Sequence, residues 1–248
     1  CALPISMPLT KQTILITGAG GGLGSTAALA LAKQGATIIL LDKSIPKLEQ
    51  LYDAIIAANA PTPAIYPFDL AGATEVQYHE LASTIEEKYG HLEGLLHSAT
   101  EFDAFTPMSI HGSLAWGHTL NVNLNAVFIL TQVLLPLLQK SQHASIVMTS
   151  DSFVHQARAY SGAYGVSKIA VESYAKILSE ELSEAGKIRV NVLIPGPVNS
   201  PLRNKAFPAE EKNKLPEMTE INPAYLYLFS PHSIGTTGQT IDALTFKL

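Results

Sequence analysis

Thr13-Ile-Leu-Ile-Thr17-Gly-Ala-Gly-Gly-Gly-Leu-Gly24 joins a short, mostly β-branched run to a cluster of glycines. The run predicts a buried strand. The Ala- and Leu-rich segment 25–34, which stops at Gly35, predicts a helix. Glycines between a strand and a helix let the backbone turn sharply and approach a pyrophosphate, while the helix N-terminus offers unpaired N–H groups. The stretch therefore predicts a dinucleotide-binding loop, although an empty glycine turn is the alternative.

The rest of the chain alternates predicted strands with predicted helices. Further strands are expected at 37–41, 64–68, 92–98, 145–149, 188–194 and 240–243, and further helices at 45–59, 74–89, 121–140, 161–185 and 224–229. This alternation predicts one α/β domain over 1–248, a doubly wound Rossmann-type domain with a mostly parallel sheet flanked by helices. The polar, Pro-punctuated segment 201–220 is expected to be the most mobile, with a substrate loop at about 200–220.

Composition narrows the classes of function. The chain has 248 residues, 47% hydrophobic and 15% charged, with a net charge of −5. A domain of this size buries roughly three quarters of its unfolded surface and needs no disulfide or structural metal. The absence of a basic block argues against nucleic acid and anionic membrane as partners. The histidines are scattered without ligand spacing, so we expect no metal site.

Localisation is expected to be cytoplasmic. The apolar segment 126–138 is too short to span a bilayer of ~30 Å. The first residues lack the features of a signal peptide. The single cysteine, Cys1, cannot form an internal bridge, which favours a reducing compartment.

Asp42 bears on the choice of dinucleotide. It ends the second predicted strand, eighteen positions after Gly24. A carboxylate there accepts both hydroxyls of the adenosine ribose and repels a 2′-phosphate. No basic residue lies in the glycine loop, although Lys43 could swing toward a phosphate. We therefore expect NAD rather than NADP, the alternative for Asp42 being a solvated residue at a strand end.

Several motifs together resemble the short-chain dehydrogenase/reductase family over nearly the whole chain. They are Thr17, Gly18, Gly22 and Gly24, Tyr164-Gly-Val-Ser-Lys168, Asn123, Asp69-Leu70, Pro195-Gly-Pro-Val-Asn-Ser200 and Gly238-Gln239-Thr240. The resemblance implies a cofactor site made of Gly18, Gly22, Leu23, Gly24, Asp42, Asp69, Leu70, Ser98, Ala99, Pro195, Val198 and Ser200. It implies a reacting centre made of Tyr164, Lys168, Asn123 and Asp151.

The Tyr164–Lys168 pair has its own chemistry. Residues four apart on a helix lie on one face, one turn from each other. An ammonium beside a phenol favours the phenolate and lowers a pKa that is otherwise ~10. We therefore expect Tyr164 to act as a general acid or base at neutral pH. An ordinary surface pair is the alternative reading of the spacing.

The chain departs from the family pattern at three places, one of which is the final strand, where the family's glycine-rich ending is lacking. After the fourth strand it has His97-Ser-Ala-Thr100 where the family has Asn-Asn-Ala-Gly, and we expect His97 to be a packed, hydrogen-bonded residue. Thirteen residues before Tyr164, where the family has a serine, it has Asp151. Either Asp151 faces the substrate, or a bulge brings Ser150 or Ser152 into the site.

The leading hypothesis is hydride transfer between NAD(H) and an alcohol or carbonyl compound. The alternative is a dinucleotide-binding regulatory or scaffold protein with little turnover. The substrate pocket is expected from 101–113, 153–160 and 200–214, which contain Phe102, Phe105, Phe153 and Phe207 and favour a partly apolar carbonyl compound.

A homodimer or homotetramer is expected because two predicted helices are apolar on too many faces for one sheet to cover, as the resemblance also implies. The residues concerned are Val127, Leu130, Leu134, Leu135 and Leu138 in one helix, and Val171, Tyr174, Leu178 and Leu182 in the other.

Overall fold

The computed structural model describes residues 8–247, so the expectation based on Cys1 lies outside the described residues. The strands are β1 (Thr13–Thr17), β2 (Thr37–Asp42), β3 (Ala64–Pro67), β4 (Gly94–His97), β5 (Ala144–Thr149), β6 (Ile188–Ile194) and β7 (Thr240–Asp242). The α-helices are α1 (Gly22–Lys33), α2 (Ile45–Ala57), α3 (Glu75–Tyr89), α4 (Ser113–Leu120), α5 (Ala126–Gln139), α6 (Gly162–Glu181), α7 (Pro201–Ala206) and α8 (Asn222–Phe229).

The strands form one parallel sheet in the order β3-β2-β1-β4-β5-β6-β7. The chain winds outward from β1 to β3 and then places β4 on the other side of β1. The carboxyl ends of β1 and β4 therefore border a crevice, which is where open α/β sheets bind their ligands. The predicted fold is confirmed, and the sheet is wholly parallel.

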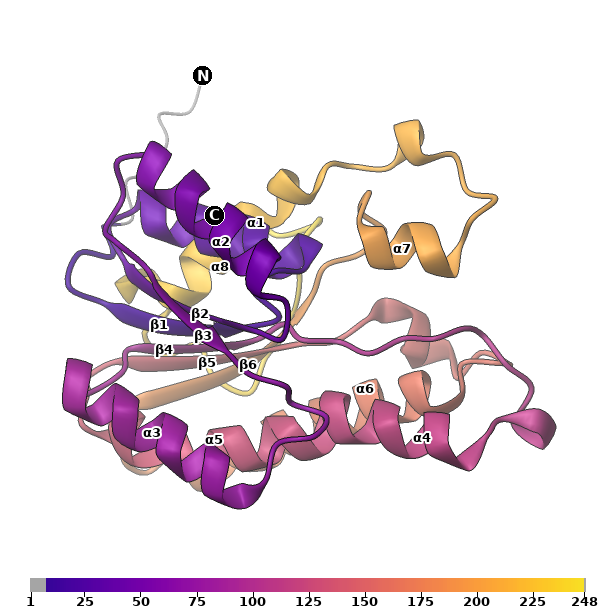
Figure 1. Cartoon of the computed structure of the whole chain (residues 1–248), viewed down its shortest axis with the longest axis horizontal. Coiled ribbons are helices and arrows are strands. Elements are labelled where there is room, and N and C mark those ends of the chain that lie inside the picture. Colours follow the sequence, from indigo (N-terminus) through magenta and orange to yellow (C-terminus); the bar gives the residue numbers. More distant parts are fainter. Residues whose placement is uncertain (1–7, 248) are drawn as a thin grey trace.

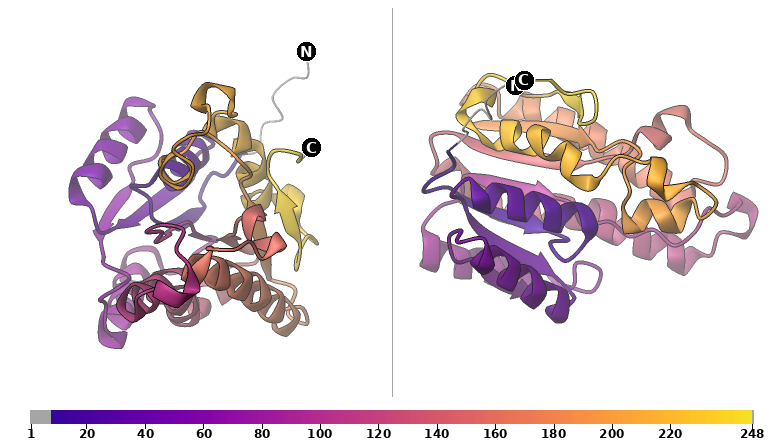
Figure 2. Two further views of the ribbon diagram at one scale, coloured as in Figure 1. Left: turned by 90° about the vertical axis from the view of Figure 1, so that its right-hand side faces the viewer. Right: turned by 90° about the horizontal axis from the view of Figure 1, so that it is seen from above.

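Helices cover both faces of the sheet (Figures 1 and 2). α1, α2 and α8 lie on one face, and α3, α5 and α6 lie on the other. Side chains that alternate along β1 consequently enter two different cores: Ile14 packs in the layer that contains Leu31 of α1, and Leu15 in the layer that contains Leu134 of α5. This two-sided burial explains why the strands are apolar at nearly every position.

The helices begin and end at somewhat different residues from those expected. α1 begins at Gly22, inside the glycine cluster, because Gly21 is its extended N-cap and the next glycines already adopt helical geometry. α4 was not predicted at all, and it runs through a π-helical turn at Asn121–Asn125 into α5. The segment expected to be most mobile contains α7, while its mobility stays a prediction.

The continuous helical stretch Ser113–Gln139 corrects the length argument about membranes. It has 27 residues and is long and apolar enough to cross a bilayer by length and composition. The apolar segment 126–138 is only part of this helix, because α4 and the π-helical turn extend the helix toward its N-terminus. Half of its most apolar window is buried inside the protein. A single helix of this kind is weak evidence for a membrane span, because core helices of soluble proteins pass the same test.

The apolar residues named for a subunit interface are mostly covered within the chain. Those buried in the core are Val127, Leu130, Leu134 and Leu138 of α5, and Val171 and Leu178 of α6. The sheet and α3 cover more of these helices than their sequences suggest. The exposed large apolar side chains on the same two helices are Phe128, Val166, Ile169 and Ile177.

Candidate active site

The turn after β1 fixes the carboxyl ends of β1 and β4 relative to each other. The Thr17 hydroxyl oxygen accepts hydrogen bonds from the backbone N–H groups of Ser98 and Ala99, both at 3.1 Å. Gly18 has a φ of 64°, and a Cβ there would lie 2.6 Å from the Ala99 Cα. A Cβ at Gly24 would lie 2.2 Å from the Gly18 carbonyl oxygen. The turn therefore requires glycine at both positions.

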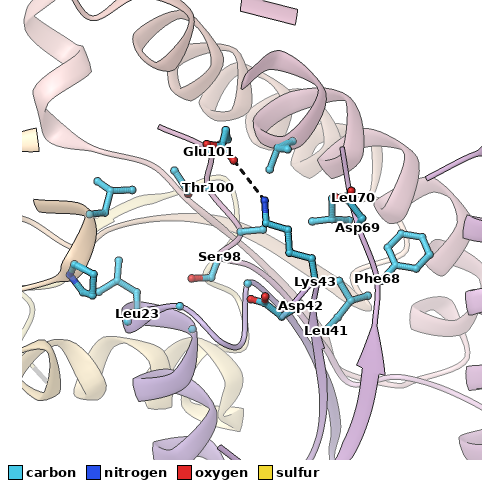
Figure 3. A pocket seen from close by; sticks show the side chains of 18 of the residues that line it. Leu23, Leu41, Asp42, Lys43, Phe68, Asp69, Leu70, Ser98, Thr100 and Glu101 are labelled. Carbon is cyan, nitrogen blue, oxygen red and sulfur yellow. Dashed lines mark ion pairs between the residues drawn. The ribbon is translucent and has the colours of Figure 1, made fainter. Parts of the chain in front are cut away.

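A groove of ≈ 240 Å³ opens beside this turn, at the crevice between β1 and β4 (Figure 3). Ten of the residues expected to contact a cofactor line it: Gly18, Gly22, Leu23, Gly24, Asp42, Asp69, Leu70, Ser98, Ala99 and Ser200. The other two, Pro195 and Val198, are buried beside the groove-forming segments and do not line it. No side chain caps the N-terminus of α1, which leaves its N–H groups free to bind an anion.

Asp42 lies at the edge of the groove with its carboxylate held by backbone donors. Its Oδ2 accepts from the Gly20 N–H at 3.0 Å, and its Oδ1 accepts from the Ser44 N–H at 2.9 Å. Carboxylate oxygens have further lone pairs, so both can still accept hydroxyl groups. This is the position that the sequence predicted for a ribose-binding carboxylate.

Asp151 lies directly beside Tyr164. The Tyr164 hydroxyl donates to Asp151 Oδ2 at 2.6 Å. β5 keeps an unbroken register with β4 up to Met148 and with β6 up to Thr149, so no bulge interrupts the strand before Asp151. Ser150 instead donates to Glu172, and Ser152 is exposed. Of the alternatives that the sequence leaves open, the structure has Asp151 at the tyrosine.

The surroundings of Tyr164 oppose its ionisation. Burial, followed by the charge of Asp151 and the hydrogen bond to it, holds the pKa of Tyr164 well above its usual value, whereas Arg203 lowers it. The expectation that Lys168 brings this phenol into the neutral range is therefore wrong. Desolvation and a neighbouring carboxylate both favour the neutral phenol, and they outweigh the opposing charge of Arg203.

Lys168 is buried one helical turn after Tyr164, as predicted. Its Nζ donates to Thr100 Oγ1 and to the Thr149 carbonyl oxygen, both at 3.0 Å. Burial lowers the pKa of Lys168 to about 8, although Asp151 and Glu172 raise it. Because Thr100 also lines the groove, Lys168 connects the groove to the helix that carries Tyr164.

Asn123 positions the loop that follows β4. Its Oδ1 accepts from the Glu101 N–H at 2.7 Å, and its Nδ2 donates to the Glu101 carbonyl oxygen at 2.9 Å and to Ser167 Oγ at 3.1 Å. Asn123 lies in the π-helical turn, a kind of irregularity that is frequent at functional sites. The side chain thus fixes both backbone groups of one loop residue against α6.

The sequence did not predict the contacts that three further residues make at this site. Thr100 accepts a hydrogen bond from Lys168, which is 68 positions away. Glu101 forms an ion pair with Lys43, and its Oε2 lies 3.5 Å from His118 Nε2. Arg203 of α7 is close enough to Tyr164 to affect its pKa. No local pattern predicts these contacts, because each joins segments that only the folded chain brings together.

His97 is a packed residue, as expected. It is 4% exposed, and its Nε2 lies 2.9 Å from Thr131 Oγ1. Burial, and then the charge of Lys168, lower the pKa of His97 to about 3. Its ring is therefore neutral at physiological pH.

The comparison with known proteins now decides the family. The model of the family described as short chain dehydrogenase matches residues 12–211. The chain belongs to the short-chain dehydrogenase family. It is 40% identical over 235 residues to the uncharacterized oxidoreductase YciK of Escherichia coli K12, which covers 95% of this chain and 92% of that protein.

Solved structures of this family are closely similar. A putative short chain dehydrogenase from Escherichia coli CFT073, complexed with NADPH, has a TM-score of 0.93 and 39% identity, covering 97% of this chain and 99% of that one. Another from Shigella flexneri 2a, complexed with NADP, has a TM-score of 0.92 and 39% identity, covering 96% and 99%. The resemblance identified in the sequence is thus confirmed at the level of family and fold.

The neutral state of buried His97 makes a prediction about stability. As pH falls below the ordinary histidine pKa of ~6.5, the unfolded chain takes up a proton that folded His97 resists until about pH 3. The free energy of unfolding should therefore decrease across that window. We expect His97→Asn to remove about 2 kcal/mol of this loss between pH 7 and pH 4.5, measured by urea unfolding. The exposed control His79→Asn should keep the wild-type slope, and an unchanged slope in His97→Asn would contradict the prediction.

Proposed function

We propose that this short-chain dehydrogenase transfers a hydride between a nicotinamide dinucleotide and an alcohol or carbonyl substrate, with Tyr164 carrying the proton. One observation supports this most strongly. Lys168 Nζ is hydrogen-bonded to Thr100, which lines the groove, and lies 5.9 Å from the centroid of the Tyr164 ring. A dinucleotide in the groove and the phenol would then both reach one carbon–oxygen bond.

Tyr164 and Asp151 would handle the substrate proton as a pair. In oxidation, the substrate hydroxyl oxygen would give its proton to this pair, and the carbon that bears it would lose a hydride, for which a nicotinamide in the groove would be the acceptor. In reduction, both transfers would reverse. An ionised carboxylate accepts hydrogen bonds but cannot donate one to a carbonyl oxygen. Asp151 also engages the Tyr164 hydroxyl at 2.6 Å. We therefore expect slower carbonyl reduction than a serine at this position would support.

The aromatic rings around Tyr164 favour an apolar substrate. Phe102 packs edge-on against Tyr164 with ring centroids 5.3 Å apart. Phe105, Phe153 and Phe207 continue the same cluster, with centroids 4.9–5.7 Å apart. These rings come from the three loop segments that were expected to shape the pocket. A partly apolar carbonyl or alcohol compound suits these surroundings, and 200–220 would form its loop.

For the cofactor we propose a preference for NAD(H). The similar structures from Escherichia coli and Shigella flexneri are complexed with NADPH and NADP. In this chain Asp42 ends β2 and lines the groove, and its carboxylate is held there by the backbone N–H groups of Gly20 and Ser44. A fixed carboxylate accepts ribose hydroxyls and repels a 2′-phosphate. The chain would then differ from these relatives in its cofactor.

A second candidate function is dinucleotide sensing with little turnover. The observation that favours it is the hydrogen bond from Tyr164 to Asp151, which leaves the phenol with a raised pKa and its proton directed away from a substrate. A groove can bind a dinucleotide without an efficient proton donor. Turnover assays over a panel of carbonyl compounds separate the two candidates, since a sensor binds the cofactor and reduces none of them.

Self-association in the cytoplasm completes the proposal. Phe128 on α5 and Val166, Ile169 and Ile177 on α6 are 43–58% exposed, and such apolar groups suit contact with a second copy of the chain. The net charge of −5 does not suit nucleic acid or an anionic membrane.

Asp151→Ser tests the role of the carboxylate. It removes the charge that raises the pKa of Tyr164 and restores a hydroxyl donor toward the carbonyl. Since one oriented donor is typically worth ~10²-fold in rate, carbonyl reduction at neutral pH should rise by about that order. Tyr164→Phe should abolish it, as measured by cofactor absorbance. An unchanged rate in Asp151→Ser, with loss of activity in Ser150→Ala or Ser152→Ala, would assign the role to a serine instead.

The role of Asp42 is tested by binding. NAD(H) should bind at least a few-fold more tightly than NADP(H), and Asp42→Ala should narrow the difference because the 2′-phosphate no longer meets a carboxylate. Fluorescence titration measures both affinities. Asp53→Ala, an exposed acid on α2, serves as the control and should leave the ratio unchanged. Equal or tighter NADP(H) binding by the wild type would refute the preference.

Light scattering tests the assembly. We expect a dimer or tetramer at micromolar concentration, and Ile169→Asp combined with Ile177→Asp should shift it toward the monomer because charge is costly in an apolar contact. A monomeric wild type would reject the proposal.

A further inference from the structure

Glu101 reaches toward Lys43 at the groove from the loop that follows β4 (Figure 3). Its backbone N–H and carbonyl are both bound by the buried Asn123 amide, so the loop cannot easily move it away. Its side chain lines the groove and is 27% exposed. Its Oε2 lies 3.9 Å from Lys43 Nζ and 3.5 Å from His118 Nε2. A carboxylate on this loop thus lies close to the cation that follows β2 and to a histidine of α4.

Lys43 is the cation that a 2′-phosphate would need. Among residues 8–247 it is the one positively charged side chain that lines the groove. It directly follows Asp42, whose carboxylate is bonded to Gly20 and Ser44. The Lys43 side chain instead extends toward Glu101, and a dashed line in Figure 3 marks this ion pair. Asp42 and Lys43 therefore point to different partners.

We propose that Glu101 is a second residue that selects the dinucleotide, because it engages Lys43 and so denies a 2′-phosphate its cation. The inference rests on the proposed function, in which the groove binds a nicotinamide dinucleotide. Asp42 repels the 2′-phosphate directly. Glu101 acts through Lys43, which would otherwise be able to form a charge-assisted hydrogen bond to that phosphate.

The expected effect is modest. The Lys43 and Glu101 side chains are 62% and 27% exposed, and ion pairs this accessible to water are weak. A phosphate that carries close to two negative charges competes with Glu101 for the same ammonium. Releasing Lys43 should therefore strengthen binding of 2′-phosphorylated ligands by about three- to tenfold, and leave ligands without this phosphate unaffected.

Calorimetric titration of the full chain with two fragments tests the inference without any turnover. Adenosine 2′,5′-bisphosphate carries the 2′-phosphate, and AMP lacks it. The variants are Glu101→Gln, Lys43→Gln and their combination. The control is Glu86→Gln, which makes the same change in an exposed ion pair with Lys140 between α3 and α5. Because Asn123 holds the Glu101 backbone rather than its carboxylate, Glu101→Gln should keep the wild-type thermal unfolding midpoint.

Glu101→Gln should bind the bisphosphate about three- to tenfold more tightly while its affinity for AMP stays constant, and the gain should disappear when Lys43→Gln is added. An unchanged affinity, an equal gain for both fragments, or a gain that survives in the double variant overturns the role of Glu101. If the double variant keeps the tighter binding of the bisphosphate, another cation such as Lys47, whose Cβ lies beside Gly20, would be responsible for it. If the wild type binds AMP but Glu101→Gln binds the bisphosphate no more tightly than the wild type does, only this inference is refuted. A wild type that binds neither AMP nor NAD(H) refutes the proposed function as well.

Discussion

The close approach of Gly24 to Gly18 is the constraint on which the site depends. A side chain at Gly24 would begin 2.2 Å from the Gly18 carbonyl oxygen, so only glycine lets α1 start so close to the end of β1. This approach aims the uncapped N-terminus of α1 into the crevice. The Thr17 hydroxyl then holds the loop after β4 against the same turn through two backbone N–H groups. Backbone atoms therefore form the floor of the groove. In the function that we propose, side chains at the rim select between NAD(H) and NADP(H).

Beyond the groove, the fold buries the phenol of Tyr164 and the ammonium of Lys168, and it leaves the carboxylate of Asp151 partly exposed. Burying such groups is costly unless each has a partner. Tyr164 is bonded to Asp151, and Lys168 is bonded to Thr100 and to the end of β5. Burial has the largest effect on both acidities: it lowers the pKa of Lys168 to about 8, and it raises the pKa of Tyr164, which the charge of Asp151 raises further. An aspartate at this position therefore makes Tyr164 a weaker acid, although the fold around it is that of the family.

Hydrogen bonds of the buried Asn123 amide hold the segments around Tyr164 and Lys168 together. Asn123 closes two hydrogen bonds on the backbone of Glu101 and a third on α6. The π-helical turn at Asn121–Asn125 places that amide inside an otherwise continuous apolar helix. The loop after β4 consequently has a fixed position, and Glu101 presents its carboxylate to Lys43 from there. One buried amide thus connects α6, the helix that carries Tyr164, to the loop that presents Glu101 at the groove.

The sequence alone determined the fold class, the glycine turn, and most of the groove residues, because strand–helix alternation and glycine spacing are local patterns. It also identified the Tyr164–Lys168 pair, since four-residue spacing places two side chains on one helical face. It did not determine the start of α4, the partner of Lys168, the direction of the Tyr164 pKa shift or which apolar faces stay exposed. Those depend on burial and on contacts between distant segments, such as Thr100 with Lys168. Only the tertiary structure decided that Asp151 meets Tyr164, because strand register, not residue type, sets where the side chain after β5 points.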